Sequence, residues 1–104
     1  MVKIDKNKLE QFLKKNENKL IIDLHGFTLA ESLYILRRKL KEIKNKKIYD
    51  NLPNITLSII TGKGLHSPDH KAVLFPNLTK WLKSLDKLSV DEKSEPGVIK
   101  VTMY

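Results

Sequence analysis

Two short apolar runs, each followed by a glycine-containing polar segment and then by a helical pattern, constrain the fold of this chain more than any other feature. Residues 20–25 and 55–60 are rich in apolar and β-branched side chains and are too short for helices, so each run predicts a largely buried strand. Gly26 closes the first run, and Gly62 and Gly64 follow the second. Strands joined through helices pair in parallel with right-handed crossovers. The core of the sequence therefore predicts an α/β fold.

A short amphipathic helix is expected ahead of the first strand. Leu9, Phe12 and Leu13 share helical spacing within residues 5–16, and the apolar face that they form is narrow. At 104 residues the chain has room for one compact domain. We divide it into an N-terminal helical extension, residues 1–19, and a domain, residues 20–104.

Helix signals follow each predicted strand. Thr28 and Glu31 form a capping box, and apolar residues then recur every three or four positions, with Lys39 among the basic residues on the other faces. Pro76 lies close to a second stripe of leucines that includes Trp81, which we expect in the core. We place Pro76 in the first turn of that helix, where N–H groups have no intrahelical acceptor.

The last segment predicts a β-hairpin. Residues 90–95 are charged, Pro96 and Gly97 supply a tight turn, and residues 98–104 are apolar again. A charged and an apolar strand joined by a turn are typical of an edge strand and an inner strand. The predicted order is one helix and then βαβαββ, with the last pair antiparallel in a small mixed sheet.

Composition limits the partners and the compartment. The chain has 20 Lys and Arg against 12 Asp and Glu, a net charge of +8, which is typical of proteins that bind phosphates, although membrane surfaces and acidic proteins attract the same charge. The sequence has no cysteine, so disulfides and thiolate metal sites are excluded and a reducing compartment is favoured. No apolar run approaches the ~18 residues of a spanning helix, and no secretory signal is readable. We expect a soluble cytoplasmic protein, with a nuclear location as the alternative, and no contact with a membrane.

The residues most suited to chemistry follow the two predicted parallel strands, where α/β sheets usually bind ligands. Asp23 and His25 are two residues apart on one strand and so project from the same face, as in many acid/base histidines. Residues 61–67 follow the second strand, and Gly62, Lys63 and Gly64 would combine backbone N–H groups with an ammonium in a phosphate cradle.

The Asp23–His25 pair and the glycine-containing loop also have purely structural explanations. An isolated Asp-x-His at a strand end is more often a turn-stabilising pair, and glycines often serve only to permit positive φ. The loop lacks the spacing of a nucleoside triphosphate or dinucleotide motif. His66 and His70 are four apart, but Pro68 intervenes and no third ligand has zinc-site spacing, so we predict no metal site there.

Residues 23–26, the pair Thr28 and Glu31, and residues 59–67 together resemble the signature blocks of the Smr (small MutS-related) domain family. The resemblance extends from about residue 20 to residue 103. It implies a two-layer βαβαββ sandwich with a mixed four-stranded sheet, similar to the C-terminal domain of bacterial translation initiation factor three, with the last strand inserted antiparallel inside the sheet.

The resemblance also implies binding and endonucleolytic cutting of nucleic acid, whether nicking of DNA, as in repair, or cleavage of RNA, including mRNA on stalled ribosomes. Asp23 and His25 match the motif implicated in cleavage. The loop that contacts nucleic acid corresponds to Gly62, Lys63 and Gly64, and we add its neighbours Gly26, Thr61, His66, Ser67 and Lys71 as binding candidates.

Departures from the family pattern place cleavage in more doubt than binding. Pro68, Asp69 and His70 stand where the family often has small residues, and Phe75 where a basic residue is frequent. Three functions stay open: an endonuclease, a non-catalytic module that binds structured nucleic acid or ribosomes, and an enzyme acting on a small phosphorylated metabolite. We expect a monomer or a piece of a larger chain. No cofactor is certain, because Asp23 would either orient His25 or hold a divalent cation such as magnesium.

Overall fold

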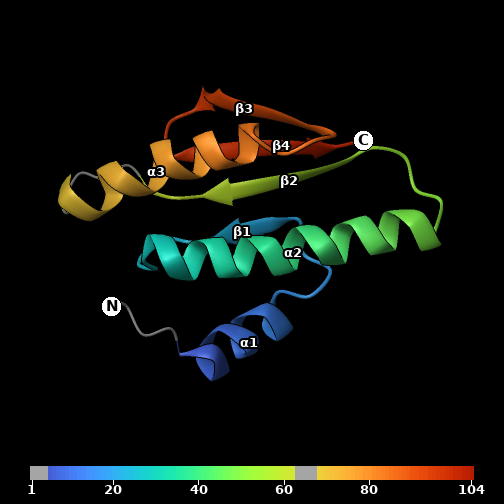
Figure 1. The fold of residues 1–104 in the computed structure, drawn as a ribbon, viewed down its shortest axis with the longest axis horizontal. Helices are drawn as coiled ribbons and strands as arrows, with labels where there is room; N and C mark the ends of the chain where they lie inside the picture. The colour runs from blue at the N-terminus through green and yellow to red at the C-terminus, as the bar shows by residue number, and fades with distance from the viewer. Residues whose placement is uncertain (1–4, 63–67) are drawn as a thin grey trace.

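The computed structural model describes residues 5–62 and 68–104. Its elements in chain order are α1 (Lys6–Lys15), β1 (Ile21–Asp23), α2 (Leu29–Tyr49), β2 (Ile55–Ile60), α3 (Pro68–Lys83), β3 (Leu88–Glu95) and β4 (Val98–Met103) (Figure 1). No helix in this part of the chain is long and apolar enough to cross a membrane.

The four strands form one mixed sheet in the order β1-β2-β4-β3. β1 and β2 are parallel, and β4 runs antiparallel to both β2 and β3. The predicted fold, with the last strand inserted inside the sheet and the charged strand at its edge, is confirmed. In Figure 1 α2 and α3 lie along the sheet, and α1 packs beside α2.

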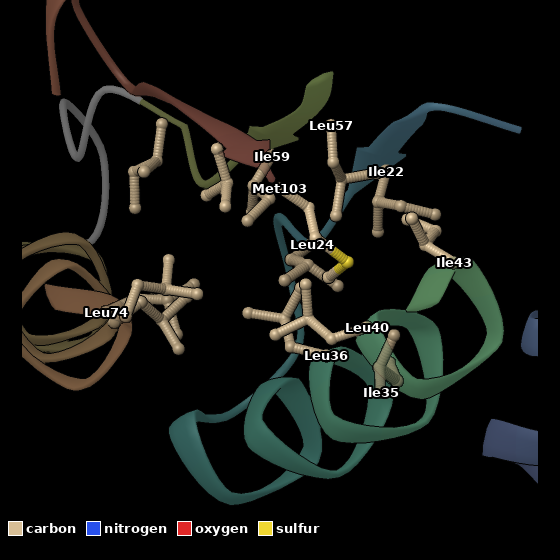
Figure 2. Close-up of a cluster of buried hydrophobic side chains, with 14 of the residues drawn as sticks. Ile22, Leu24, Ile35, Leu36, Leu40, Ile43, Leu57, Ile59, Leu74 and Met103 are labelled. Carbon is tan, nitrogen blue, oxygen red and sulfur yellow. The ribbon is translucent and has the colours of Figure 1, made fainter. Parts of the chain in front are cut away.

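Side-chain alternation divides the sheet into a covered and an uncovered face. Ile22, Ile59 and Ile99 are register partners on the covered face, and none of them is exposed. They pack against leucines and isoleucines of α2 and α3, as Figure 2 shows. The uncovered face carries more polar residues, among them Asp23 and Lys100. The result is the expected two-layer arrangement.

β1 is less buried than its sequence predicts. Only Ile22 is buried within the strand, and Leu24 just beyond it, while Leu20 and Ile21 are exposed. The prediction of a largely buried first strand is therefore wrong. The reason is topological: β1 is an edge strand of a sheet that helices cover on one face only.

The helix starts follow their capping residues. Asp5 caps α1 by accepting from the Lys8 N–H at 3.2 Å. The predicted capping box of α2 is present, with the Thr28 hydroxyl accepting from the Glu31 N–H at 3.2 Å and the Glu31 carboxylate accepting from the Thr28 N–H at 2.8 Å. The second helix therefore begins where its sequence indicates.

The third helix begins earlier than predicted. α3 starts at Pro68, so Pro76 lies inside the helix and its placement in the first turn is wrong. Pro68 satisfies the first-turn preference instead, and the helix continues past Pro76 although a proline there removes one backbone hydrogen bond. Burial of Leu74, Leu78 and Leu82 on both sides of Pro76 opposes that loss.

The burial of Lys39 also differs from the prediction. The sequence places Lys39 among the basic residues on faces of α2 away from its apolar stripe, yet its side chain is only 1% exposed. Its ammonium donates to the Asn16 carbonyl and to the Glu42 carboxylate, both at 2.8 Å. The cause is α1, which places its C-cap residue Asn16 beside the face of α2 that carries Lys39.

Trp81 is half-buried at the margin of the core, where Arg37 lies 5.9 Å from the ring centroid. A guanidinium in this position makes a cation–π contact. The expected packing of Trp81 against the core is present, but one side of the ring faces a charged residue.

Candidate functional site

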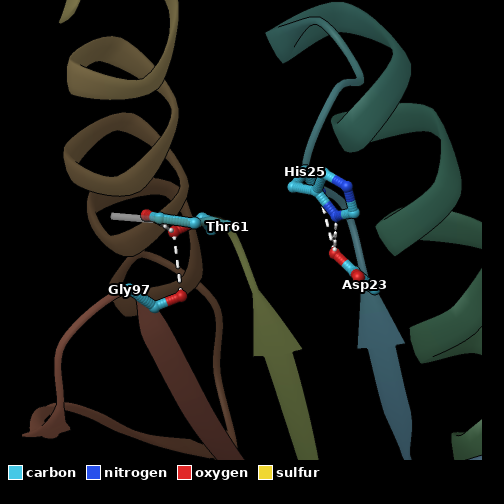
Figure 3. A network of polar contacts seen from close by, with 5 residues as sticks. Asp23, His25, Thr61 and Gly97 are labelled. Atoms are coloured by element: carbon cyan, nitrogen blue, oxygen red, sulfur yellow. Dashed lines mark hydrogen bonds and ion pairs between the residues drawn. The ribbon is translucent and has the colours of Figure 1, made fainter. Parts of the chain in front are cut away.

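Asp23 and His25 lie at the carboxyl end of β1 and are held together by two hydrogen bonds. One oxygen of the Asp23 carboxylate accepts from the His25 backbone N–H at 3.0 Å and contacts the ring Nδ1 at 2.6 Å (Figure 3). Their chain neighbours Ile22 and Leu24 point into the core and are not exposed. The two-residue alternation of a strand therefore leaves both polar side chains on the uncovered side, as predicted.

The contact between the two side chains sets the chemistry of the imidazole. An ionised carboxylate can only accept hydrogen bonds, so Nδ1 carries the proton that it donates to Asp23. In the neutral ring Nε2 is then the basic nitrogen. The His25 side chain is 63% exposed, which leaves the ring accessible to a ligand.

The pKa of the Asp23 carboxyl is lowered from its ordinary value of 3.8. Desolvation is the largest single contribution and acts in the opposite direction, but the two hydrogen bonds from His25 and its charge together outweigh it. Asp23 is therefore a carboxylate in the neutral pH range, as the orientation of His25 requires.

The carboxyl end of β2 lies beside this pair. Asp23 and Ile60 are register partners, and the Leu24 N–H donates to the Ile60 carbonyl at 2.7 Å. The next residue, Thr61, is buried, and both its N–H and its hydroxyl donate to the Gly97 carbonyl, at 2.8 and 3.1 Å. Figure 3 shows this hydrogen-bonded connection between the end of β2 and the β3–β4 turn, next to the Asp23–His25 pair.

Two glycines at this edge adopt a backbone conformation that other residues rarely take. Gly26 has φ +86° and Gly62 has φ +88°. At Gly26 a Cβ would meet no atom within 4 Å, so the need for glycine there comes from the backbone angle and not from crowding. Gly26 turns the chain from β1 toward α2.

The structure thus brings together five of the predicted site residues at one edge of the sheet: Asp23, His25, Gly26, Thr61 and Gly62. The predicted binding residues Lys63, Gly64, His66 and Ser67 lie outside the described residues. Lys71 belongs to α3, but its side chain is also outside the described part. Their predicted roles rest on the sequence.

Lys8 lies near the site but was not among the binding residues predicted from the sequence. Its ammonium lies 5.6 Å from the ring centroid of Phe27, two residues after His25, and Phe12 packs edge-on against the same ring at a centroid distance of 5.0 Å. α1 therefore supports the segment that follows His25 and adds a positive charge next to it. No motif signals this contact, because Lys8 lies far from Asp23 and His25 in sequence.

No group of three or more His, Cys, Asp or Glu side chains suited to a metal occurs among residues 5–62 and 68–104 with described side chains. At this edge Asp23 offers the oxygen ligand that magnesium prefers. Its Oδ1 already accepts twice from His25. A cation here would need its other ligands from substrate phosphate and water.

The fold and this edge define a compact α/β domain with an Asp-x-His pair beside a glycine-flanked strand end. Residues 22–97 match the Smr domain family, so the chain belongs to that family.

Two longer proteins are similar to this chain in sequence. The chain is 36% identical over 78 residues to Endonuclease NBR9 of Saccharomyces cerevisiae and 35% identical over 98 residues to NEDD4-binding protein 2 of Homo sapiens. These alignments include 75% and 91% of this chain but only 30% and 5% of the two relatives.

Solved Smr domains share its architecture. The solution structure of the B3BP Smr domain superposes with a TM-score of 0.70 at 28% identity and covers 94% of this chain and 90% of that one. The solution structure of the Smr domain of NEDD4-binding protein 2 gives 0.65 at 33% identity, covering 85% and 88%.

Proposed function

We propose that this domain binds nucleic acid and cuts its phosphodiester backbone, with His25 as the proton-transfer group and Asp23 as the residue that orients it. The observation that carries the proposal is the 2.6 Å contact between Asp23 Oδ1 and His25 Nδ1 on an accessible strand end. This contact leaves Nε2 free to act as a base. Membership of the Smr family and the resemblance to a protein named as an endonuclease support the same reaction class.

With RNA as the substrate, the reaction needs only groups of the chain, the substrate itself and solvent water. His25 Nε2 takes the proton of the 2′-hydroxyl, the 2′-oxygen attacks phosphorus, and the bond from phosphorus to the 5′-oxygen breaks. The leaving 5′-oxygen takes a proton from water, and the His25 imidazolium returns its proton to solvent, so the products are a 2′,3′-cyclic phosphate and a 5′-hydroxyl. Asp23 stabilises the imidazolium that forms, and Lys63 offsets charge that develops on the phosphate.

With DNA as the substrate there is no 2′-hydroxyl. A water must then be the nucleophile, and Asp23 would hold a divalent cation such as magnesium while His25 positions or deprotonates that water. The two routes differ in their dependence on a metal and in the ends that they leave. They are the two catalytic forms of the proposal.

Binding rests on the net charge of +8 and on cations next to the strand ends. Lys8 over Phe27 is one such cation, and Lys63 is another by its place in the sequence. Contacts of this type go to the phosphate backbone and recognise shape more than base sequence. Structured RNA, including RNA on a ribosome, and branched DNA are the substrate classes that fit.

A second candidate function is a binding module without chemistry. The observation that favours it is the hydrogen bond from the His25 backbone N–H to Asp23 Oδ1 at 3.0 Å, because this bond by itself stabilises the turn after β1. In this alternative the pair preserves the shape of the strand end, and nucleic acid binds beside it without being cut.

The test is a gel assay with end-labelled RNA and DNA, each with magnesium and with EDTA. His25→Ala should lower cleavage by roughly 10²- to 10⁴-fold, because it removes the general base, while affinity changes little. Asp23→Asn should follow the same pattern, because it preserves the shape of the side chain and removes its charge. Asp50→Asn makes the same chemical change at the exposed C-cap of α2 and should leave cleavage unchanged.

Two further results separate the alternatives. RNA cleavage that survives EDTA and leaves cyclic phosphate ends identifies His25 as the base, whereas loss of activity in EDTA identifies a metal held partly by Asp23. Cleavage by the wild-type protein no greater than that of His25→Ala rejects catalysis and leaves the binding module.

A further inference from the structure

A cavity of about 580 Å³ lies at the end of the sheet opposite Asp23 and His25. It opens between the C-terminal half of α2 and the end of β4, where Met103 pairs with Ile55 at the start of β2. In Figure 1 the arrowheads of β1 and β2 point away from the C-terminus, which follows β4. The two sites therefore lie at opposite ends of the strands.

The lengths of the elements explain the cavity. α2 has 21 residues and is about 30 Å long at ~1.5 Å per residue, whereas β2 has six residues and is about 20 Å long. The helix therefore extends beyond the sheet that it covers. Residues 85–87, between α3 and β3, also line the resulting space.

The interior of the cavity is aliphatic. Leu40, Leu85, Leu88 and Met103 contribute to its lining, and Leu40 and Met103 belong to the core of the domain. Tyr104, which is exposed, also lines it. Apolar surface of this kind favours a ligand that brings an apolar group of its own.

The rim of the cavity is strongly basic. Lys41, Lys44 and Lys47 recur at three-residue spacing along α2, and Lys87, in the segment before β3, lines the same cavity. Asp86 is the single acidic side chain in the lining, against four lysines. Among the residues that the structure describes, none of the four lysines makes an ion pair.

We infer that this cavity, with its floor at Leu40 and Met103 and its rim at Lys44 and Lys87, binds an acidic peptide segment that carries an apolar side chain. The rim lysines pair with the carboxylates of the segment, and the apolar side chain enters the aliphatic floor. Charge complementarity selects the class of partner, and the floor adds affinity that charge alone does not give.

A nucleotide is the less suitable occupant. Its phosphate would suit the rim, but the edges of a base carry donors and acceptors that need partners once buried. The leucines and the methionine of the floor provide none. An apolar side chain loses no hydrogen bond on entering the same space.

The position of the cavity has a functional consequence. Because it lies at the opposite end of the sheet from the proposed cleavage site, a peptide and a nucleic acid can be bound at the same time. The domain would then hold nucleic acid at one end and an acidic region of a protein partner at the other.

The test uses the 104-residue chain and a fluorescein-labelled peptide in which a central Leu-Phe pair is flanked on both sides by glutamates. Met103 is one of two methionines, so its methyl group gives an assignable NMR signal inside the cavity. The peptide should shift this signal and bind with an affinity measurable by fluorescence anisotropy. A peptide with Gly-Gly in place of Leu-Phe should bind more weakly and leave the methyl signal unmoved.

Charge reversal at the rim supplies the matched comparison. The double variant Lys44→Glu, Lys87→Glu should weaken peptide binding about tenfold, a few-fold for each exposed charge. Lys19→Glu with Lys93→Glu changes the net charge equally at exposed positions that do not line the cavity, and it should have a much smaller effect.

Three outcomes would overturn the inference. The first is an unmoved Met103 methyl signal with saturating peptide. The second is equal affinity for the Leu-Phe and Gly-Gly peptides, which would reduce the interaction to diffuse charge. The third is a single-stranded RNA oligonucleotide that shifts the Met103 signal when the peptide does not, which would assign the cavity to nucleic acid. The first two measurements use the wild-type chain, so a variant that fails to fold does not affect them.

Discussion

Replacing Lys39 with methionine tests how α1 is attached to the rest of the domain. The Lys39 side chain is 1% exposed, and its ammonium donates to the Asn16 carbonyl at the end of α1 and to the Glu42 carboxylate. Lys39→Met retains the unbranched apolar stem and removes both hydrogen bonds. The change therefore isolates the contribution of the ammonium from that of the packing.

The expected loss of stability depends on whether each of the two acceptors, the Glu42 carboxylate and the Asn16 carbonyl, finds another hydrogen-bond donor after the substitution. The Glu42 side chain is 35% exposed and can be hydrated by water, so losing its ion pair with Lys39 costs little free energy. The Asn16 carbonyl is partly buried and also accepts from the Lys19 N–H at 3.1 Å, so it keeps one partner, and the loss is that of one hydrogen bond from a charged donor, about 1.5–3 kcal/mol. Removing the desolvation penalty of a buried ammonium acts in the opposite direction. We expect a net loss of about 2 kcal/mol in the free energy of unfolding.

Thermal unfolding followed by circular dichroism measures this loss. For a domain of this size about 1 kcal/mol shifts Tm by roughly 4–8 °C, so Lys39→Met should lower Tm by about 8–16 °C. Lys41→Met alters an exposed lysine of the same helix and should stay within about 0.5 kcal/mol of the wild type. If Lys39→Met were as stable as the wild type or more stable, desolvation of the ammonium would outweigh its hydrogen bonds, and the reasoning would be wrong.

Two further predictions concern the site. If Lys8, which lies over Phe27, contacts one phosphate of the proposed nucleic-acid ligand, Lys8→Ala should reduce the slope of log affinity against log salt by up to about one. Lys19→Ala is the matched control, and equal slopes in both variants would remove Lys8 from the interface. An NMR titration should place the pKa of Asp23 below 3.8, and His25→Ala should return it to that value or above, because desolvation then acts alone. Because the pKa of Asp23 is lowered in the folded state, Asp23 stabilises the fold above about pH 3.8. This stabilisation is lost as the pH falls through the folded-state pKa. A midpoint that His25→Ala does not move would show that the two side chains do not interact in solution.

Short-range patterns in the sequence were sufficient to predict most of the fold and the pairing of Asp23 with His25 at the end of β1. The alternation of Ile22, Asp23, Leu24 and His25 determines which side chains face the core, and the structure has them on those sides. The capping box at Thr28 is similarly local, because both of its hydrogen bonds lie within four residues. Predictions of this kind succeed because the physical cause and its signal occupy the same few residues.

Features that depend on contacts between distant segments were not predictable in the same way. Periodicity assigns one apolar stripe to α2, but it does not say that α1 covers a second face and buries Lys39. The interior position of Pro76 depends on Pro68 and on burial of leucines on both sides. The basic cavity arises because α2 is longer than β2. It could not be predicted from either segment alone, because it depends on how the two elements are aligned in the fold.

The contacts of α1 connect stability to the proposed site. The family match begins at residue 22, yet Leu9 of α1 is fully buried in the core of the domain. Phe12 of α1 packs on Phe27, and one turn further along the carbonyl of the C-cap residue Asn16 accepts from Lys39. Phe27 follows the turn at Gly26 that begins with His25, so the position of that turn depends on a helix outside the family motif. The geometry of the Asp23–His25 pair is therefore set partly by local hydrogen bonds and partly by the packing of α1, and a change that loosens α1 should act on the site without touching either residue.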